Sequence, residues 1–428
     1  MSVQECDLTK KRVVSLAVAM GANTLAFSIV YPFLPIYLHT IRGIPMAKVG
    51  LVFPVMGLAT IIGAPCAGFF ADRIGRRVLM IWGPVFRSLT FVVLALLAHI
   101  NGPFWSFAVS LFVAALAGMF FKNSADAYLA DMVPSEQRTR AFGKLRIGLN
   151  IGWMIGPAIG AFLARTPFSL VFLLTAVLCL GSTVITVKFC PPLPETQKKK
   201  SEAVSDKHLF TSMFVKNRRV IPVLIFSFIM FLSISQFVST LSIYSTETVG
   251  ISKTLLGFLY TINGAIVIVF QVPIDRLLKQ WSNYARTSAG AALYGAVYIL
   301  FAFSSGWGHL AGGIVIMTIG EICVLTALVS AVSRIAPVHM VGRYLGAYGM
   351  VKGLGWTIGP YFGALCFDAF KGNPLILPYF GTLLFGAFKE NPLLLWSALS
   401  LGAWIGAAGF LCMSILQHRK STFLKCNS

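Results

Sequence analysis

The sequence predicts an all-α polytopic membrane protein, with 12 transmembrane helices in two pseudo-symmetric six-helix bundles. Of its 428 residues, 57% are hydrophobic and only 11% are charged, and the mean hydropathy is +0.80. Soluble domains carry about 25% charged residues, so composition excludes a packed aqueous fold. Lipid offers the backbone no hydrogen bonds, and the apolar runs lack the alternating polar residues of barrel strands. These runs must therefore be helices.

Twelve apolar runs are long enough to cross a hydrocarbon layer of about 30 Å, which takes about 20 helical residues. A polar linker at 190–220 divides the runs six and six, so we expect an N-terminal bundle at 1–189 and a C-terminal bundle at 221–428. The runs fall near 12–38, 48–71, 78–100, 104–130, 141–164, 168–189, 221–245, 254–275, 287–305, 309–333, 344–367 and 391–416.

A shorter apolar piece lies between the last two runs. The phrase "FDAFKGNPL" at 367–375 recurs as "FGAFKENPL" at 385–393. The piece between the two copies, about 375–388, is too short to span, and we interpret it as re-entrant or interfacial. We interpret the recurrence itself as a local duplication without a function.

Basic residues gather in the loops on one side of the predicted bundles. By the positive-inside rule this asymmetry predicts that both termini and the linker are cytoplasmic, in a multi-pass protein of the bacterial inner membrane. Topology and anionic lipid headgroups account for much of the net charge of +21, so nucleic acid is not an expected partner. Besides the lysine run of the linker, the basic side holds Lys10, Lys11, Arg12, Arg73, Arg76, Arg77, Arg138, Arg140, Arg276, Lys279, Arg286, Arg334, Arg343, Arg419, Lys420 and Lys425. The opposite loops hold Arg42, Lys48, Arg165, Lys253, Lys371 and Lys389.

One helical phrase occurs twice: "GWMIGPAIGA" at 152–161 returns as "GWTIGPYFGA" at 355–364, 203 residues later. The same offset matches further residues upstream, which predicts two like halves in one orientation. Parallel repeats of this kind suit a transporter that rocks one half against the other about a site near the midplane. Glycines on one helix face allow close helix packing, and an internal proline bends the helix, so packing and gating are both open roles. The repeated positions are Gly152, Gly156, Pro157, Gly160, Gly355, Gly359, Pro360 and Gly363.

The loop "GFFADRIGRR" at 68–77 follows the second predicted helix. It resembles the G-x-x-x-D-R-x-G-R-R signature of the major facilitator superfamily, and the two like halves extend the resemblance across nearly the whole chain. The resemblance implies a conformational latch, in which Asp72 faces the positive end of helix 11 and Arg76 meets an acid at the end of helix 4, with Asp131 as the candidate. The charge rule alone would explain the arginines but not the glycines or Asp72. The latch positions are Gly68, Asp72, Arg73, Gly75, Arg76, Arg77 and Asp131.

The phrase in helix 5 is similar to the antiporter motif of that superfamily, G-x-x-x-G-P-x-x-G-G, with Ala161 in the last place. "RYLGAYGM" and "TIGE" are similar to its drug:proton antiporter branch. That branch usually carries an arginine in helix 4 shortly before a glycine such as Gly118. Alanine stands there in this chain, and Lys122, one turn later, is the candidate substitute. The resemblance implies proton-coupled efflux of small amphipathic compounds by alternating access. The alternatives are a proton-linked transporter of an organic anion or metabolite, and a non-transporting receptor or scaffold.

Glu321 lies twelve residues from either end of the run at 309–333, near the bilayer centre. An ionised acid there costs about 2.5–3.5 kcal/mol, so it should face a wet cavity or a partner, or be protonated. We interpret Glu321 as a proton-coupling residue, with a structural hydrogen bond as the alternative. Asp126 is the second candidate for proton coupling.

Lys122 and Asp126 are spaced so that their side chains meet on one helix face, and Asn123 extends this polar strip. A neutralised pair without substrate contact is the alternative to a cavity role. In the superfamily, helices 1, 4, 7 and 10 line the cavity, which supplies the remaining candidates; Ser28, Ser233 and Ser235 are weaker ones. The predicted cavity residues are Asn23, Tyr31, Lys122, Asn123, Asp126, Gln236, Tyr244 and Glu321.

Three more cations fall inside predicted helices: Arg87, Arg146 and Lys352. The last two lie near helix ends, from which a long side chain can reach the interface, but Arg87 is deeper. If two or more of them face the cavity, the substrate is an organic anion rather than a cationic drug.

The sequence contains no catalytic constellation, so we expect no enzyme activity. No G-x-x-x-x-G-K-[ST] motif appears, which excludes ATP as the energy source. The eight cysteines show no CxxC or Cys/His spacing, and we expect neither a metal nor a disulfide framework. We expect no cofactor, with the proton as coupling ion, and a monomer whose partners are a small-molecule substrate and the lipid bilayer.

Overall fold

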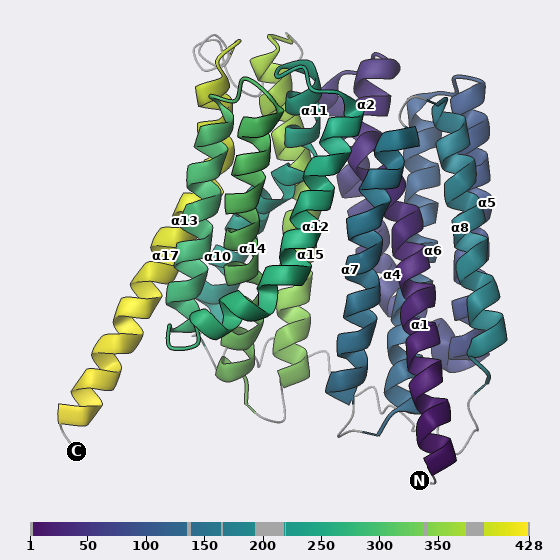
Figure 1. Cartoon of the computed structure of the whole chain (residues 1–428), viewed down its shortest axis with the longest axis horizontal. Coiled ribbons are helices and arrows are strands. Elements are labelled where there is room, and N and C mark those ends of the chain that lie inside the picture. The colour runs from purple at the N-terminus through teal and green to yellow at the C-terminus, as the bar shows by residue number, and fades with distance from the viewer. Residues whose placement is uncertain are drawn as a thin grey trace. The chain divides into compact units, whose positions relative to one another are not determined.

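The computed structural model describes residues 3–134, 138–163, 166–192, 218, 220–337, 341–373 and 389–426. All the regular secondary structure in those ranges is helical (Figure 1). The helices of the first half are α1 (Val3–Val30) with its continuation through η1 (Tyr31–Phe33), α2 (Leu34–Ile36) and η2 (Tyr37–Ile41), then α3 (Met46–Gly50), α4 (Val52–Ile74), α5 (Arg76–His99), α6 (Phe104–Met132), α7 (Arg138–Leu163) and α8 (Phe168–Phe189). The helices of the second half are α10 (Val220–Ile234), η5 (Ser235–Phe237), α11 (Thr240–Glu247), α12 (Lys253–Leu277), α13 (Asn283–Phe301), α14 (Trp307–Ile335), α15 (Val341–Phe370) and α17 (Pro392–Cys426).

Each of the twelve predicted runs coincides with one helical segment. Within the described ranges, ten segments are long and apolar enough to cross a membrane. The other two predicted runs lie in α13 and α15, which are rich in glycine, alanine and tyrosine. The expectation of an all-helical, multi-pass membrane protein is confirmed.

Local sequence sets where the helices begin and end. Gly75 separates α4 from α5 with φ +96°, a left-handed conformation that favours glycine. Pro103 and Pro167 stand in extended backbone directly before α6 and α8, where a missing N–H costs nothing. The Ser282 side chain caps α13 by accepting a hydrogen bond from the Ala285 amide.

Large apolar side chains cover the outer surface of the helices. Val109 on α6 and Val184 on α8 are 61% and 63% exposed, and similar residues line the outer faces of α5 and α17. In water such a surface would drive aggregation, whereas in a bilayer it is the surface that lipid wets.

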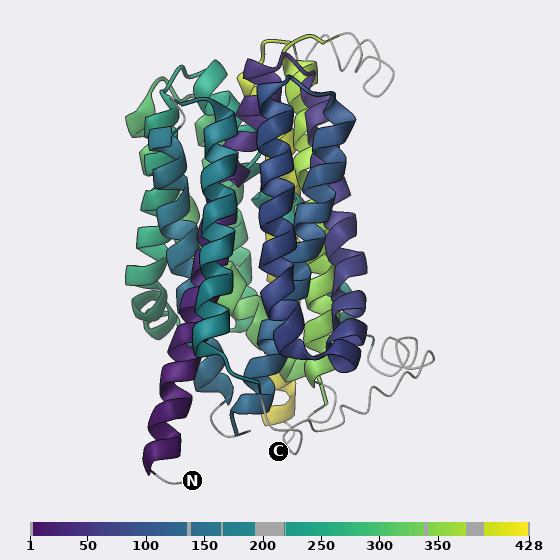
Figure 2. The same cartoon turned by 90° about the vertical axis from the view of Figure 1, so that its right-hand side faces the viewer.

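The chain forms two compact units. Unit 1 comprises residues 1–37, 54–203 and 252–264. In it, α5 packs against α6 and α8, while α1 packs against α7 and α8 (Figures 1 and 2).

Unit 2 comprises residues 38–53, 204–251 and 265–428. In it, α13 packs against α14 and α17, α10 packs against α15 and α17, and α3 packs against α15. Each unit therefore takes a short segment from the opposite half of the sequence. Most of the predicted linker at 190–220 and the short apolar piece at 375–388 lie outside the described residues, so the domain boundary in the linker stays a prediction.

Candidate functional site

The repeated glycines of α7 hold that helix against α1. A Cβ atom at Gly152 would lie 2.7 Å from the carbonyl oxygen of Gly21, and one at Gly156 would overlap the hydroxyl of Ser28. That hydroxyl donates a hydrogen bond of 2.8 Å to the carbonyl of Gly152. Gly160 continues the contact toward the end of α1.

Unit 2 repeats this construction between α15 and α10. A Cβ at Gly355 would overlap Phe231, and one at Gly359 would overlap the hydroxyl of Ser235. The amide of Gln236 donates to the carbonyl of Gly359 at 2.7 Å.

Three further repeated positions complete the two helix phrases. A Cβ at Gly363 would overlap the side chain of Gln236. Pro157 lies inside α7 and Pro360 lies inside α15. The repeated phrase thus makes close helix contacts in both units, while its gating role stays a prediction.

The candidate latch includes an ion pair. Arg76, at the start of α5, pairs with Asp131 near the end of α6, and its Nη1 also donates to the Ala127 carbonyl at 2.5 Å. The structure thus brings together the two residues that the superfamily resemblance paired. Their side chains are only 19% and 13% exposed, so little solvent screens the pair.

The other latch residues lie around the turn between α4 and α5. Arg77 donates through Nε to the carbonyl of Cys190 at 2.6 Å and so ties α5 to the end of α8. Arg73 stacks over the ring of Phe69, with its guanidinium carbon 4.2 Å from the ring centroid. Gly68 is exposed, and the side chain of Asp72 lies outside the described residues. The latch itself stays a prediction.

Glu321 lies at the middle of α14, fourteen residues from either end of Trp307–Ile335. It is half-buried, and the ring of Tyr294 of α13 packs against the adjacent Gly320. Beside it, a Cβ at Gly320 would lie 2.8 Å from the carbonyl oxygen of Gly290, so α13 and α14 are in close contact at this depth.

A polar cluster that sequence reasoning missed lies farther along α14. Arg286 pairs with Asp275 and donates to Thr326 at 3.2 Å, and Thr326 donates to Asp275 at 3.0 Å. The cluster contains one cation and one acid, so its charges are balanced. Its contacts join α12, α13 and α14, which explains it as a structural feature.

The polar strip of α6 is present as the spacing predicts. Lys122 Nζ lies 3.3 Å from Asp126 Oδ2, with side chains 50% and 35% exposed. Asn123 is half-buried, and its amide nitrogen has no hydrogen-bond partner within the described part of the chain.

Two other predicted cavity residues lie inside unit 2. Gln236 is fully buried and also accepts a hydrogen bond from Thr240 at 2.8 Å. Tyr244 is buried against Trp396, with ring centroids 5.2 Å apart. The structure uses both in packing, and whether either meets a substrate stays a prediction.

Asn23 and Tyr31 lie in unit 1 on either side of Phe27. The Arg87 guanidinium donates to Asn23 Oδ1 at 2.5 Å and lies 4.9 Å from the centroid of Phe27. The ring of Tyr31 lies 4.8 Å from Phe27 on the other side. Arg87 also reaches Gly118, where a Cβ would lie 2.9 Å from its Nη1. The place beside Gly118 is thus occupied by a cation from α5.

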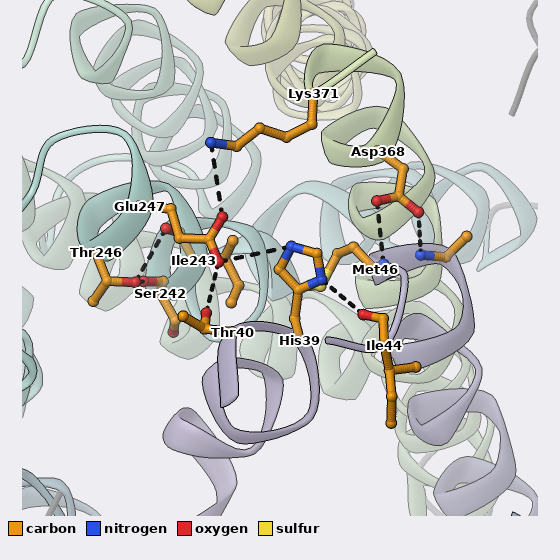
Figure 3. A network of polar contacts seen from close by, with 11 residues as sticks. His39, Thr40, Ile44, Met46, Ser242, Ile243, Thr246, Glu247, Asp368 and Lys371 are labelled. Atoms are coloured by element: carbon orange, nitrogen blue, oxygen red, sulfur yellow. Dashed lines mark hydrogen bonds and ion pairs between the residues drawn. The ribbon is translucent and has the colours of Figure 1, made fainter. Parts of the chain in front are cut away.

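Residues 38–53 form a second polar network that sequence reasoning missed (Figure 3). Glu247 at the end of α11 accepts a hydrogen bond of 2.6 Å from Thr40 and lies 3.7 Å from both His39 and Lys371. Asp368 of α15 accepts from the backbone amides of Met46 and Ala47 at 3.1 and 2.6 Å, which caps α3. Figure 3 shows both acids turned toward this segment. Within unit 2, two carboxylates therefore bind residues 38–53 to α11 and α15.

Among the described residues, no group of three His, Cys, Asp or Glu side chains could hold a metal. Six cysteines whose side chains the structure describes are free thiols: Cys66, Cys179, Cys190, Cys323, Cys366 and Cys412.

Comparison with known proteins bears on the family. A sequence model of the Major Facilitator Superfamily matches residues 16–360. The MFS-type transporter YqjV of Bacillus subtilis (strain 168) is 26% identical over 360 residues, 82% of this chain and 86% of YqjV. The quinolone resistance protein NorA of Staphylococcus aureus (strain MSSA476) is 24% identical over 359 residues, 82% of this chain and 89% of NorA.

Solved structures show the same fold. A bacterial homologue of the human lysosomal transporter Spinster, in its inward-facing and unoccupied conformation, superposes with a TM-score of 0.74 at 14% identity, covering 95% of this chain and 97% of that one. The nucleoside transporter NupG superposes with a TM-score of 0.73 at 13% identity, covering 94% and 99%. At such identities the likeness concerns the fold alone.

Proposed function

Because the chain belongs to the Major Facilitator Superfamily and is a membrane transporter rather than an enzyme, we propose that it exports small amphipathic compounds in exchange for protons. It would work by alternating access as a monomer in the bacterial inner membrane, with both termini cytoplasmic and the proton as coupling ion.

The observation that carries this proposal is the position of Glu321. A carboxylate at the centre of a membrane-spanning helix is expensive and is therefore a functional candidate by default. Glu321 is half-buried, and the adjacent Gly320 packs against the ring of Tyr294, 3.4 Å from a Cβ built at that glycine. Such a group can be neutral in one state of the carrier and ionised in another, which is the requirement for moving a proton with each cycle.

Two further observations support export. The sequence similarity to proteins named for quinolone resistance and multidrug resistance extends over 82% and 58% of this chain. The repeated glycine phrase that resembles the antiporter motif forms close helix contacts in both units.

The test is transport in proteoliposomes, with norfloxacin as a fluorescent quinolone probe and protein-free vesicles as the baseline. An acidic lumen should drive norfloxacin into vesicles that contain the wild-type chain, because protons leave as the drug enters. Glu321→Gln should abolish this accumulation yet keep the exchange of labelled for unlabelled norfloxacin at equal pH. Glu390→Gln removes an exposed acid outside the helices and should behave as wild type.

Each alternative function gives a different result. A proton-linked importer of organic anions would accumulate its substrate when the exterior, not the lumen, is acidic. A receptor or scaffold would show no flux under either gradient. Full accumulation by Glu321→Gln would exclude this residue from proton coupling.

A further inference from the structure

A buried cation without an acid lies in the interior of unit 1. Arg87 is 6% exposed and Asn23 is 5% exposed. The single hydrogen bond between them uses one N–H of the guanidinium and the oxygen of the amide. Among the described residues, neither Arg87 Nε nor Asn23 Nδ2 has a hydrogen-bond partner. Two donor nitrogens, one of them part of a permanent positive charge, therefore lie unused.

The neighbouring groups do not neutralise this charge. The rings of Phe27 and Phe91 lie 4.9 and 6.0 Å from the guanidinium carbon, and Gly118 leaves room for its Nη1. No carboxylate within the described ranges forms an ion pair with Arg87, unlike Arg76 and Arg286. A buried arginine stays charged, and a buried charge without an acid is destabilising, so the arrangement favours an anion from outside the chain.

An aromatic surface adjoins the cation. Phe27 and Tyr31 lie 4.8 Å apart, and Trp153 of α7 meets both edge-on at 6.2 and 6.0 Å. Trp153 is 39% exposed and the other two rings are half-buried, so this cluster reaches the surface of the unit. An aromatic body stacked there would place an attached carboxylate toward Arg87 across Phe27.

The position of Arg87 along α5 favours a solute over a lipid headgroup as the anion that it binds. Arg87 lies eleven residues from Arg76 and twelve from His99, the two ends of α5. At 1.5 Å per residue this is roughly 16–18 Å from either end, so a headgroup at the interface lies more than a helix diameter away.

We propose that Arg87 and Asn23 form an anion subsite that binds the carboxylate of an aromatic, amphipathic substrate. The inference rests on the proposed transport function and deepens it, since it names the substrate class. The guanidinium and the Asn23 amide donate to the two carboxylate oxygens, and the cluster of Phe27, Tyr31 and Trp153 holds the apolar part. A neutral ester of the same compound keeps the stacking contact and loses the charged one.

The experiment measures equilibrium binding, which needs no proton gradient. Purified protein in phosphatidylcholine nanodiscs is titrated with 1-pyrenebutyrate and with its methyl ester, using energy transfer from tryptophan to pyrene and empty nanodiscs as the baseline. Wild type should bind the carboxylate at least about tenfold more tightly than the ester. Arg87→Gln should erase this preference by weakening carboxylate binding alone.

Two more variants keep the test decisive if Arg87→Gln folds poorly. Asn23→Asp keeps the guanidinium and supplies an internal carboxylate, so it should also erase the preference. Lys188→Gln removes an exposed cation of the same unit, in the last turn of α8, and should keep it.

Preference for the carboxylate in Arg87→Gln or in Asn23→Asp, or no preference in wild type, would overturn the subsite. Loss of the wild-type preference when phosphatidylglycerol replaces phosphatidylcholine, measured at high salt so that surface repulsion of the probe is screened, would assign the site to the anionic lipid headgroup and overturn the substrate assignment. If the binding results hold but norfloxacin is not transported, the proposed export function fails and the subsite stands.

Discussion

Gly156→Ala tests whether the repeated phrase acts through close helix packing. The new Cβ would take the position of the Ser28 hydroxyl, which donates to the Gly152 carbonyl at 2.8 Å. Overpacking costs about 1–3 kcal/mol, and the lost hydrogen bond costs about 1 kcal/mol more. Removing a glycine from a helix returns about 1 kcal/mol. We therefore expect a net destabilisation of about 1–3 kcal/mol, measured by thermal unfolding in detergent with tryptophan fluorescence.

Gly143→Ala is the matched control on the same helix, because nothing lies within 4 Å of a Cβ at that position. It should unfold at the wild-type temperature or above. Ser28→Ala combined with Gly156→Ala should recover part of the loss, since the overlapping hydroxyl is gone. If Gly156→Ala is as stable as Gly143→Ala, the close-packing explanation is wrong.

Three further predictions concern groups near the helix ends. Arg76→Ala should destabilise the protein by about 3 kcal/mol in the same unfolding assay, because it strands Asp131, whereas exposed Arg73→Ala should have little effect. Asp368→Ala should speed hydrogen exchange of the peptide at 44–50, since two backbone amides lose their acceptor; unchanged exchange would contradict the cap. Burial raises the pKa of Cys190 to about 11. Alkylation of this thiol, detected by mass spectrometry, should therefore be slow at pH 7.5 until the protein is denatured. Because the unfolded chain loses this proton at a lower pH than the folded chain, the free energy of unfolding should fall as the pH rises from 9 toward 11.

The sequence was sufficient to predict the helical segments and the repeated glycine positions, which depend on periodic or repeated features. Run length and composition located all twelve helical segments, because the bilayer fixes both length and polarity. The 203-residue repeat predicted which glycines would share a function, and they make matching contacts in the two units. The pairing of Arg76 with Asp131 came from the resemblance, which carries information about a contact between distant residues.

What the sequence could not supply were contacts between helices that no motif links. The absence of an arginine on α6 directed attention to Lys122, yet Lys122 pairs with its own helix neighbour Asp126. The guanidinium beside Gly118 comes from Arg87, on a different helix. The contacts of residues 38–53 with α11 and α15 could not be predicted either, because Glu247 and Asp368 lie more than 200 residues from Thr40 and Met46 in the sequence.

The two units place their deepest charges at equivalent helix–helix contacts, on opposite helices of the pair. In unit 1, Gly83 of α5 packs on Ala117 of α6, and in unit 2, Gly290 of α13 packs on Gly320 of α14 in the same way. This correspondence aligns α13 with α5 at an offset of 207 residues and α14 with α6 at an offset of 203 residues.

By these offsets Arg87 corresponds to Tyr294, and Gly118 corresponds to Glu321. The same helix–helix contact thus holds a cation over a glycine in unit 1 and a phenol beside an acid in unit 2. If the two units were unchanged copies of one another, the same side chains would occupy these positions in both. Opposite charges near the middle of corresponding helix pairs would suit a carrier in which one unit binds an anionic substrate while the other exchanges a proton.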